Sequence, residues 1–176
     1  MLTPEQLKEI ETSSLPGAIQ LVAALFPGQV VFSSSLGQED QVITDAISRN
    51  KIPVKIFTID TGRLFSETYE LLDRTIARYK NPIHVYFPDA SDVETFVLEK
   101  GVNSFYESVE NRKACCHIRK VKPLERALMG AKVWITGLRA DQSGNRCRGT
   151  ESYGNAGHDA RGSQQFERGA RFASGW

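Results

Sequence analysis

Two adjacent cysteines, Cys115 and Cys116, carry the most specific chemistry in this sequence. Neighbouring α-carbons lie ~3.8 Å apart across a trans peptide, which is shorter than disulfide geometry normally allows, so a bridge between the two would be strained. Nearby positive charge favours thiolates, the form that binds metals and does redox chemistry. Two small buried residues on a helix are the alternative. Basic residues flank the pair on both sides: Arg112, Lys113, Arg119 and Lys120.

A segment rich in serine and glycine is a candidate phosphate-binding loop. The apolar run 30–32 leads into Ser33, Ser34, Ser35 and Gly37, and residues 40–49 carry apolar side chains at helical spacing. The N–H groups that begin a helix are free to bind an anion, and small residues let it come close. An ordinary turn with a serine N-cap is the alternative. No Gly-Lys-Ser/Thr follows, so the segment is not a Walker loop.

Three arginines, Arg63, Arg139 and Arg146, lie in segments that follow predicted strands. Arginine recognises oxyanions through paired hydrogen bonds. The formal net charge of the chain is only +1, so basic residues gathered at one edge predict a small polyanion, and a nucleotide fits best. Taken singly, each arginine reads as a surface charge.

The elements that position these residues alternate along the chain. Strands are expected at 30–32, 54–60, 83–87 and 132–137, with helices between them. This order predicts an α/β fold with a mostly parallel, doubly wound sheet and helices on both faces. Ligands of such sheets bind beyond the carboxyl ends of the strands, where strand order reverses. If that point lies between the first and fourth strands, the loops after Ser33 and Gly137 form two walls of one crevice.

Local signals place the helix ends. Residues 3–6 read as a capping box, and a second helix follows from Leu15. Ser66 should begin a helix, and residues 91–94 should cap another that ends at Gly101. The helix that begins at Ser66 should bury Leu71, Leu72, Ile76 and Tyr79. A helix over 111–121 is expected to restart at Pro123.

Composition fits one soluble domain of 176 residues with 40% hydrophobic content. The near-neutral charge predicts no bulk attraction to nucleic acid or to a membrane surface. No apolar run approaches the ~20 residues that span a bilayer, and the N-terminus lacks the apolar core of a signal peptide. Three cysteines do not make a secreted disulfide framework, so a cytoplasmic protein is expected.

The C-terminal part differs in composition. From Arg139 to Trp176 there is no Val, Ile, Leu or Met, and half of the 14 glycines lie from Gly144 onward. Such a segment buries too little apolar surface to offset its ordering entropy. We therefore predict a domain over 1–146 and a glycine-rich, irregular tail over 147–176.

Four motifs together resemble the assimilatory adenylyl-sulfate reductases, which belong with the phosphoadenylyl-sulfate reductases and share the fold of adenine-nucleotide α-hydrolases. The motifs occupy 33–40, 59–64, 112–124 and 136–143, in the order and spacing of the family. The resemblance implies the reduction of adenosine 5′-phosphosulfate to sulfite and AMP by thioredoxin. A nucleophilic cysteine near the C-terminus of the family is absent here, so the sequence predicts a truncated or aberrant ending after Arg146 and assigns no catalytic residue.

The resemblance also implies binding residues. Cys115 and Cys116 match two of the four ligands of a 4Fe-4S cluster. The nucleotide-binding loop corresponds to Ser33, Ser34, Ser35, Gly37 and Asp40, and the adenosine-side motif to Thr61, Gly62 and Arg63. The phosphosulfate would be held by Lys113, Arg139 and Arg146.

Other functions stay open at this stage. A 3′-phosphoadenylyl-sulfate reductase is one alternative, and an inactive adenine-nucleotide-binding domain is another. A third is an enzyme that cleaves ATP at the α-phosphate, although such chemistry has no use for paired thiolates. Assembly into a homo-oligomer is also left open.

Overall fold

The computed structural model describes residues 2–138, 163–165 and 171–174. The strands are β1 (Val30–Ser33), β2 (Lys55–Ile59), β3 (Ile83–Tyr86), β4 (Val133–Thr136), β5 (Ser163–Gln165) and β6 (Arg171–Ser174). The helices of the first half are α1 (Pro4–Thr12), α2 (Leu15–Leu25), α3 (Gln38–Arg49) and α4 (Ser66–Tyr79). The later ones are α5 (Ala90–Lys100), the 3-10 turn η1 (Ser104–Tyr106), α6 (Val109–Cys116), the π-helical segment η2 (His117–Val121) and α7 (Lys122–Leu128).

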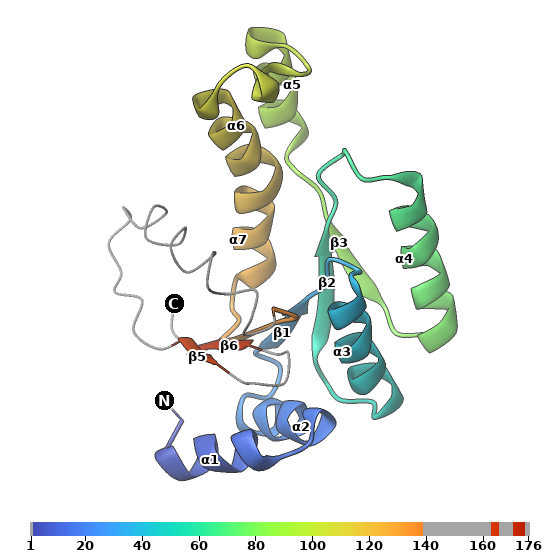
Figure 1. The fold of residues 1–176 in the computed structure, drawn as a ribbon, viewed down its shortest axis with the longest axis vertical. Coiled ribbons are helices and arrows are strands. Elements are labelled where there is room, and N and C mark those ends of the chain that lie inside the picture. The colour runs from blue at the N-terminus through green and yellow to red at the C-terminus, as the bar shows by residue number, and fades with distance from the viewer. Residues whose placement is uncertain (1, 139–162, 166–170, 175–176) are drawn as a thin grey trace.

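The strands form one sheet in the order β3-β2-β1-β4-β6-β5 (Figure 1). The first four are parallel, and β6 and β5 are antiparallel additions beyond β4. The predicted α/β fold with a mostly parallel sheet is confirmed. From β1 the chain moves to β2 on one side and later returns to β4 on the other, so strand order reverses between β1 and β4, where the sequence placed the crevice.

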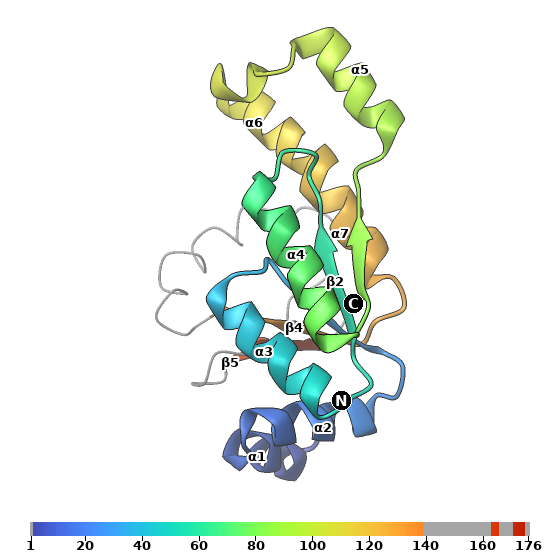
Figure 2. The same ribbon diagram turned by 90° about the vertical axis from the view of Figure 1, so that its right-hand side faces the viewer.

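Helices cover both faces of the sheet, as predicted (Figures 1 and 2). Alternate strand residues point to opposite faces, so Phe32 and Ile135 pack into a core shared with α1, α2 and α3. Val31 and Phe57 face the other way and pack against Leu128 of α7. The second face is only partly covered by α7, and that leaves space beside it at the carboxyl edge of the strands.

Within the tail, the prediction of irregular structure is wrong for the two short strands β5 and β6. The backbone of β6 pairs with β4, which would otherwise present the unpaired N–H and C=O groups of an edge strand. Ladder hydrogen bonds need no aliphatic side chains, and composition therefore did not reveal this pairing. The rest of the tail and the predicted boundary at residue 146 lie outside the described residues.

Several predicted helix ends are confirmed. Thr3 forms the capping box with Gln6, and Gly101 ends α5 at a φ of 89°. Two details are wrong. Asp89, not Ser91, caps α5, because its carboxylate accepts the Ser91 N–H at 3.0 Å. Leu71 is 38% exposed, on the rim of the buried face of α4.

Pro123 does not restart a helix, because α6, η2 and α7 follow one another without a break. The π-helical turns of η2 end just before Pro123, which then lies in the first turn of α7. Pro123 has no N–H to donate to the preceding turn, and it comes just after the wider π turns of η2, where the hydrogen-bond pattern of an α-helix is already interrupted, so the column continues past it. Helices that look separate in the sequence are therefore one column (Figure 2).

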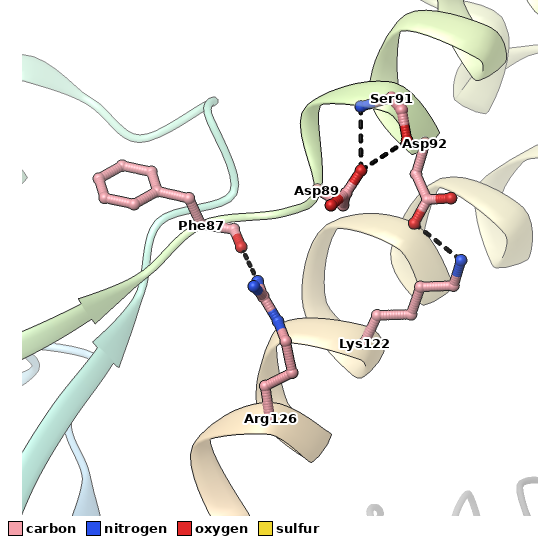
Figure 3. Close-up of polar contacts among 6 residues, drawn as sticks. All are labelled: Phe87, Asp89, Ser91, Asp92, Lys122 and Arg126. Atoms are coloured by element: carbon pink, nitrogen blue, oxygen red, sulfur yellow. Dashed lines mark hydrogen bonds and ion pairs between the residues drawn. The ribbon is translucent and has the colours of Figure 1, made fainter.

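Helices α5 and α6 lie beyond the carboxyl ends of β2 and β3 (Figures 1 and 2). Polar contacts fasten α5 and the segment that precedes it to α7 (Figure 3). Lys122 Nζ forms an ion pair with Asp92 Oδ2 at 2.7 Å, and the Arg126 guanidinium donates to the Phe87 carbonyl. Across the described ranges, no helix is long and apolar enough to cross a membrane.

Candidate functional site

A cavity of about 820 Å³ lies at the carboxyl ends of β1, β2 and β4. It occupies the point where strand order reverses, as expected for an open α/β sheet. The residues that line it come from these strands, from the loops that follow them, and from α3, α4, η2 and α7. Its principal side chains are those of Ser33, Ser34, Ser35, Asp40, Thr61, Arg63, Lys120, Val121, Leu124, Trp134 and Thr136.

One side of the cavity is apolar. Phe57, Trp134 and Leu124 line it, and all three belong to the core between the sheet and α7. The strand register explains this wall, because Ser33 pairs with both Phe57 and Thr136, and paired residues of parallel strands project to the same face. A flat apolar wall beside hydroxyl groups suits an aromatic base carried on a polar sugar.

The loop after β1 is shaped by its own side chains. Ser33 Oγ accepts the Trp134 Nε1–H at 2.8 Å, and Ser34 Oγ accepts the Leu36 N–H at 3.1 Å. Leu36 is buried at a φ of 64°, a left-handed conformation that costs a residue with a Cβ of order 1–3 kcal/mol. Gly37 is the N-cap of α3, so the alternative of a serine N-cap is wrong.

The N–H of Ser35, within the candidate phosphate-binding loop, already has a hydrogen-bond partner. Ser35 donates its backbone N–H to Asp40 Oδ2 at 2.5 Å and its hydroxyl to the same oxygen at 2.7 Å. Asp40 is 7% exposed and lies in the first turn of α3. A carboxylate there already stabilises the positive end of the helix dipole.

The loop after β2 is held by a second buried carboxylate. Asp60 accepts the Gly62 N–H and the Tyr69 hydroxyl, both at 2.7 Å. The hydrogen bond to Asp60 also raises the pKa of Tyr69. Arg119 donates to the Thr61 carbonyl at 2.7 Å, and Gly62 adopts a φ of 73°, which suits glycine. The Thr61–Gly62 backbone is therefore fixed at the cavity wall.

Arg63 lines the cavity and also contacts the segment after α5. Its guanidinium donates to the Val102 carbonyl and, at 3.4 Å, to Asn103 Oδ1, and it lies 4.8 Å from the centre of the Phe105 ring. These partners are uncharged. An anion in the cavity would therefore find this cation without having to displace a carboxylate.

Lys120 is a site residue that the sequence analysis missed, since it was noted only as a neighbour of the cysteines. It lies in η2 and lines the cavity, whereas Lys113 of α6 is not among the described residues that do so. Its spacing from the cysteines gave no signal, because the cysteine pair does not itself line the cavity.

Cys115 and Cys116 end α6, where they are half-buried free thiols. The helix column leads from them directly to Lys120 and Leu124 at the cavity. In the part of the chain that the structure describes, no three His, Cys, Asp or Glu side chains gather as metal ligands do. Cys147 lies outside that part, as do the predicted phosphosulfate residues Arg139 and Arg146.

The predicted site residues thus divide into groups. Gly37 and Gly62 shape the loops but are not among the lining residues, and Lys113 and the cysteine pair lie farther along the column. The residues that the structure brings together at the cavity are Ser33, Ser34, Ser35, Asp40, Thr61 and Arg63.

Comparisons with known proteins indicate the family of this chain. The family model described as the phosphoadenosine phosphosulfate reductase domain matches residues 29–151. Proteins named adenosine 5′-phosphosulfate reductase are similar: that of Rhizobium meliloti is 51% identical over 78% of this chain and 52% of its own length. The protein of the same name from Allochromatium vinosum is 41% identical over 82% of this chain and 59% of its own length. The chain therefore spans about half the length of the curated relatives it matches.

A solved structure is also similar. It is the phosphoadenylyl-sulfate (PAPS) reductase from Candida auris in a phosphate complex, with a TM-score of 0.63 and 28% identity over 81% of this chain and 71% of that one. The family model alone covers well over half of the chain, and the sheet order and the cavity at the β1–β4 switch point fit it. The chain belongs to the phosphoadenosine phosphosulfate reductase family.

Proposed function

We propose that the cavity binds adenosine 5′-phosphosulfate as a substrate for reduction. The observation that carries this proposal is the cavity itself, which joins an apolar wall of Phe57 and Trp134 to a wall bearing the cations Arg63 and Lys120. An adenine ring needs the first, and a phosphosulfate needs the second. The names of the relatives favour adenosine 5′-phosphosulfate over its 3′-phosphorylated form.

The charges favour one orientation of the ligand. The Asp40 carboxylate lies at the end of the cavity near the β1 loop, where it would repel a phosphosulfate. Lys120 lies on the helix column that carries the cysteines, and Arg63 lies on the loop after β2. We therefore place the anionic group near Lys120 and Arg63, and the nucleoside toward the β1 loop.

The proposed reaction yields sulfite and AMP. Sulfur gains two electrons, which a dithiol such as that of thioredoxin supplies as it becomes a disulfide, and the bond between sulfur and the bridging oxygen of AMP breaks. Positive charge near the departing phosphate would stabilise the charge that develops there. We assign no residue of this chain to the attack on sulfur. Two free thiols and a thioredoxin partner suit a reducing compartment such as the cytoplasm.

The proposed reaction does not depend on an iron–sulfur cluster. A 4Fe-4S cluster takes four cysteine ligands, and the described residues offer two, Cys115 and Cys116. That donor set does not hold such a cluster by itself, and no step of the proposed reaction passes through one. An anaerobic assay of iron and acid-labile sulfide, with Cys116→Ser as control, tests whether the chain acquires further ligands.

A nucleotide-binding domain without turnover is the second candidate, and it is favoured because the described residues offer two cysteines where a 4Fe-4S cluster takes four. Isothermal titration calorimetry with adenosine 5′-phosphosulfate, AMP and ATP tests what both candidates share. We expect adenosine 5′-phosphosulfate to bind more tightly than ATP, and equal affinities would refute the phosphosulfate assignment. Thioredoxin-dependent release of sulfite then separates the two candidates, since the binding domain would release none.

A further inference from the structure

Gly137, which directly follows β4, lies against Asp40 in the first turn of α3. A Cβ placed on Gly137 would overlap Asp40 Oδ1, and it would also lie 3.1 Å from Asp40 Cγ and 3.2 Å from the Asp40 backbone nitrogen. Real Cβ atoms essentially never come as close to another atom as this Cβ would to Oδ1. The Asp40 side chain therefore fills the space in which any other residue at position 137 would need its first carbon.

Asp40 is held in that space by its other oxygen. Oδ2 accepts both the backbone N–H and the hydroxyl of Ser35, so the carboxylate cannot turn away from Gly137 without losing both bonds. One side chain thus joins three parts of the site: the β1 loop at Ser35, the start of α3, and the β4 loop at Gly137.

The β1 loop needs such support. Leu36 is buried in the left-handed region, and side-chain hydrogen bonds hold the backbone around it. Ser34 Oγ holds the Leu36 N–H, and Asp40 holds Ser35. Backbone strain of this kind persists only where the surroundings impose it.

From this geometry we propose that Asp40 is a positioning residue rather than a ligand of the nucleotide, and that the contact between Asp40 and Gly137 sets the spacing of the two loops that flank the cavity. This inference rests on the proposed function, because the spacing matters only if a nucleotide binds between the loops. It changes the role of Asp40 from that implied by the family resemblance, which grouped it with the binding loop.

Three variants of the full chain test the proposal through their affinity for adenosine 5′-phosphosulfate. Gly137→Ala and Asp40→Ala should each weaken binding by about tenfold or more. Each change disturbs the hydrogen bonds from Ser35 to Asp40, and the loss of hydrogen bonds to a charged group changes an equilibrium constant by about this factor. Asp40→Asn keeps an acceptor oxygen and nearly the same volume, so its affinity should stay within about threefold of the wild type. Gly17→Ala is the matched control, since Gly17 lies in α2, away from the cavity, and its Cβ would meet only Ser13 and Ser14 side chains.

The double variant that combines Asp40→Ala with Gly137→Ala gives the sharpest result. Removing the Asp40 carboxylate removes the overlap with an alanine at position 137, so Gly137→Ala should cost little further affinity in an Asp40→Ala background. Additive losses would overturn the proposal, because they would mean that the two residues act independently.

Two measurements separate the possible failures. Hydrogen exchange of residues 33–37 should be faster in Asp40→Ala than in Asp40→Asn, and equal rates would overturn the positioning role whether or not a nucleotide binds. If the wild type binds nucleotide and the single variants bind equally well, only this inference fails. If the folded wild type binds no adenine nucleotide, the proposed function fails together with the inference that depends on it. Circular dichroism identifies any variant that does not fold, in which case Asp40→Asn decides the outcome, because a loss of affinity well above threefold in that variant would overturn the positioning role.

Discussion

Replacing Lys120 with alanine should weaken the binding of adenosine 5′-phosphosulfate far more than the same change at Lys113. The two lysines lie on one helical column and differ in position by seven residues. Only Lys120 is among the described residues that line the cavity. Comparing the two variants therefore tests whether the phosphosulfate is bound by Lys120, which the structure indicates, or by Lys113, which the family resemblance implied.

The expected magnitude follows from distance and exposure. An ammonium group that donates to a charged oxygen contributes ~1.5–3 kcal/mol, and solvent screening at an exposed side chain such as Lys120 reduces this to about 1–1.5 kcal/mol. That corresponds to an increase in Kd of about 5- to 13-fold. Seven residues at 1.5 Å each place Lys113 about 10 Å farther along the column. This is about one Debye length at 0.1 M salt, so Lys113→Ala should change Kd by about twofold or less.

The assay is calorimetric titration of the full chain with adenosine 5′-phosphosulfate at 0.05 and 0.3 M salt. A direct contact through Lys120 should leave a clear difference between the two variants at both concentrations, while any effect of Lys113→Ala should fade at the higher one. Equal losses at 0.3 M salt, or a larger loss for Lys113→Ala, would refute the assignment of the anionic group to the Lys120 side of the cavity.

Three other predictions concern the support of the site. Trp134→Phe keeps an aromatic ring in the cavity wall but removes the donor to Ser33 Oγ, so the free energy of unfolding in urea should fall by about 1 kcal/mol, whereas Trp134→Leu should in addition weaken nucleotide binding. Arg63→Ala removes the contacts to Val102 and Phe105, so hydrogen exchange of residues 101–106 should become faster, and unchanged exchange would show that α5 and α6 hold this segment alone. The hydrogen bond from Tyr79 lowers the pKa of Asp45, so its stabilisation is present above pH 3.8 and is lost as the pH falls through the lowered pKa. The difference in unfolding free energy between wild type and Tyr79→Phe should therefore shrink below about pH 4, and a constant difference down to pH 2 would contradict this coupling.

The sequence was sufficient for the parts of the fold that depend on periodicity. Alternating strands and helices determined the parallel sheet, and the same reasoning located the crevice between the β1 and β4 loops. The capping box at Thr3 and the left-handed glycine at position 101 were readable because each depends on neighbours within a few residues. Leu71 was misplaced because a helical repeat defines a face but not how far the neighbouring element covers it.

The parts of the site that could not be predicted depend on contacts between distant segments. Nothing near Asp40 in the sequence indicates that Gly137 abuts its carboxylate, or that Trp134 donates to Ser33 across about a hundred positions. Lys120 was overlooked because a family match favoured Lys113, and only the course of the helix column shows which lysine reaches the cavity. The pairing of β6 with β4 was hidden because backbone hydrogen bonds leave little trace in composition.

The π-helical segment has a consequence for how this protein can change by insertion and deletion. A π turn contains about one residue more than an α turn, and each residue turns an α-helix by about 100°. Deleting one residue within His117–Val121 would thus let an unbroken α-helix form, and because the widened turn only absorbs that extra residue, Cys115 and Cys116 would keep about the same direction relative to α7. Tightening the turn without a deletion would instead leave one residue too many and rotate the two thiols by about 100°. These five residues are therefore a place where the chain can lose one residue without changing the direction of its thiols.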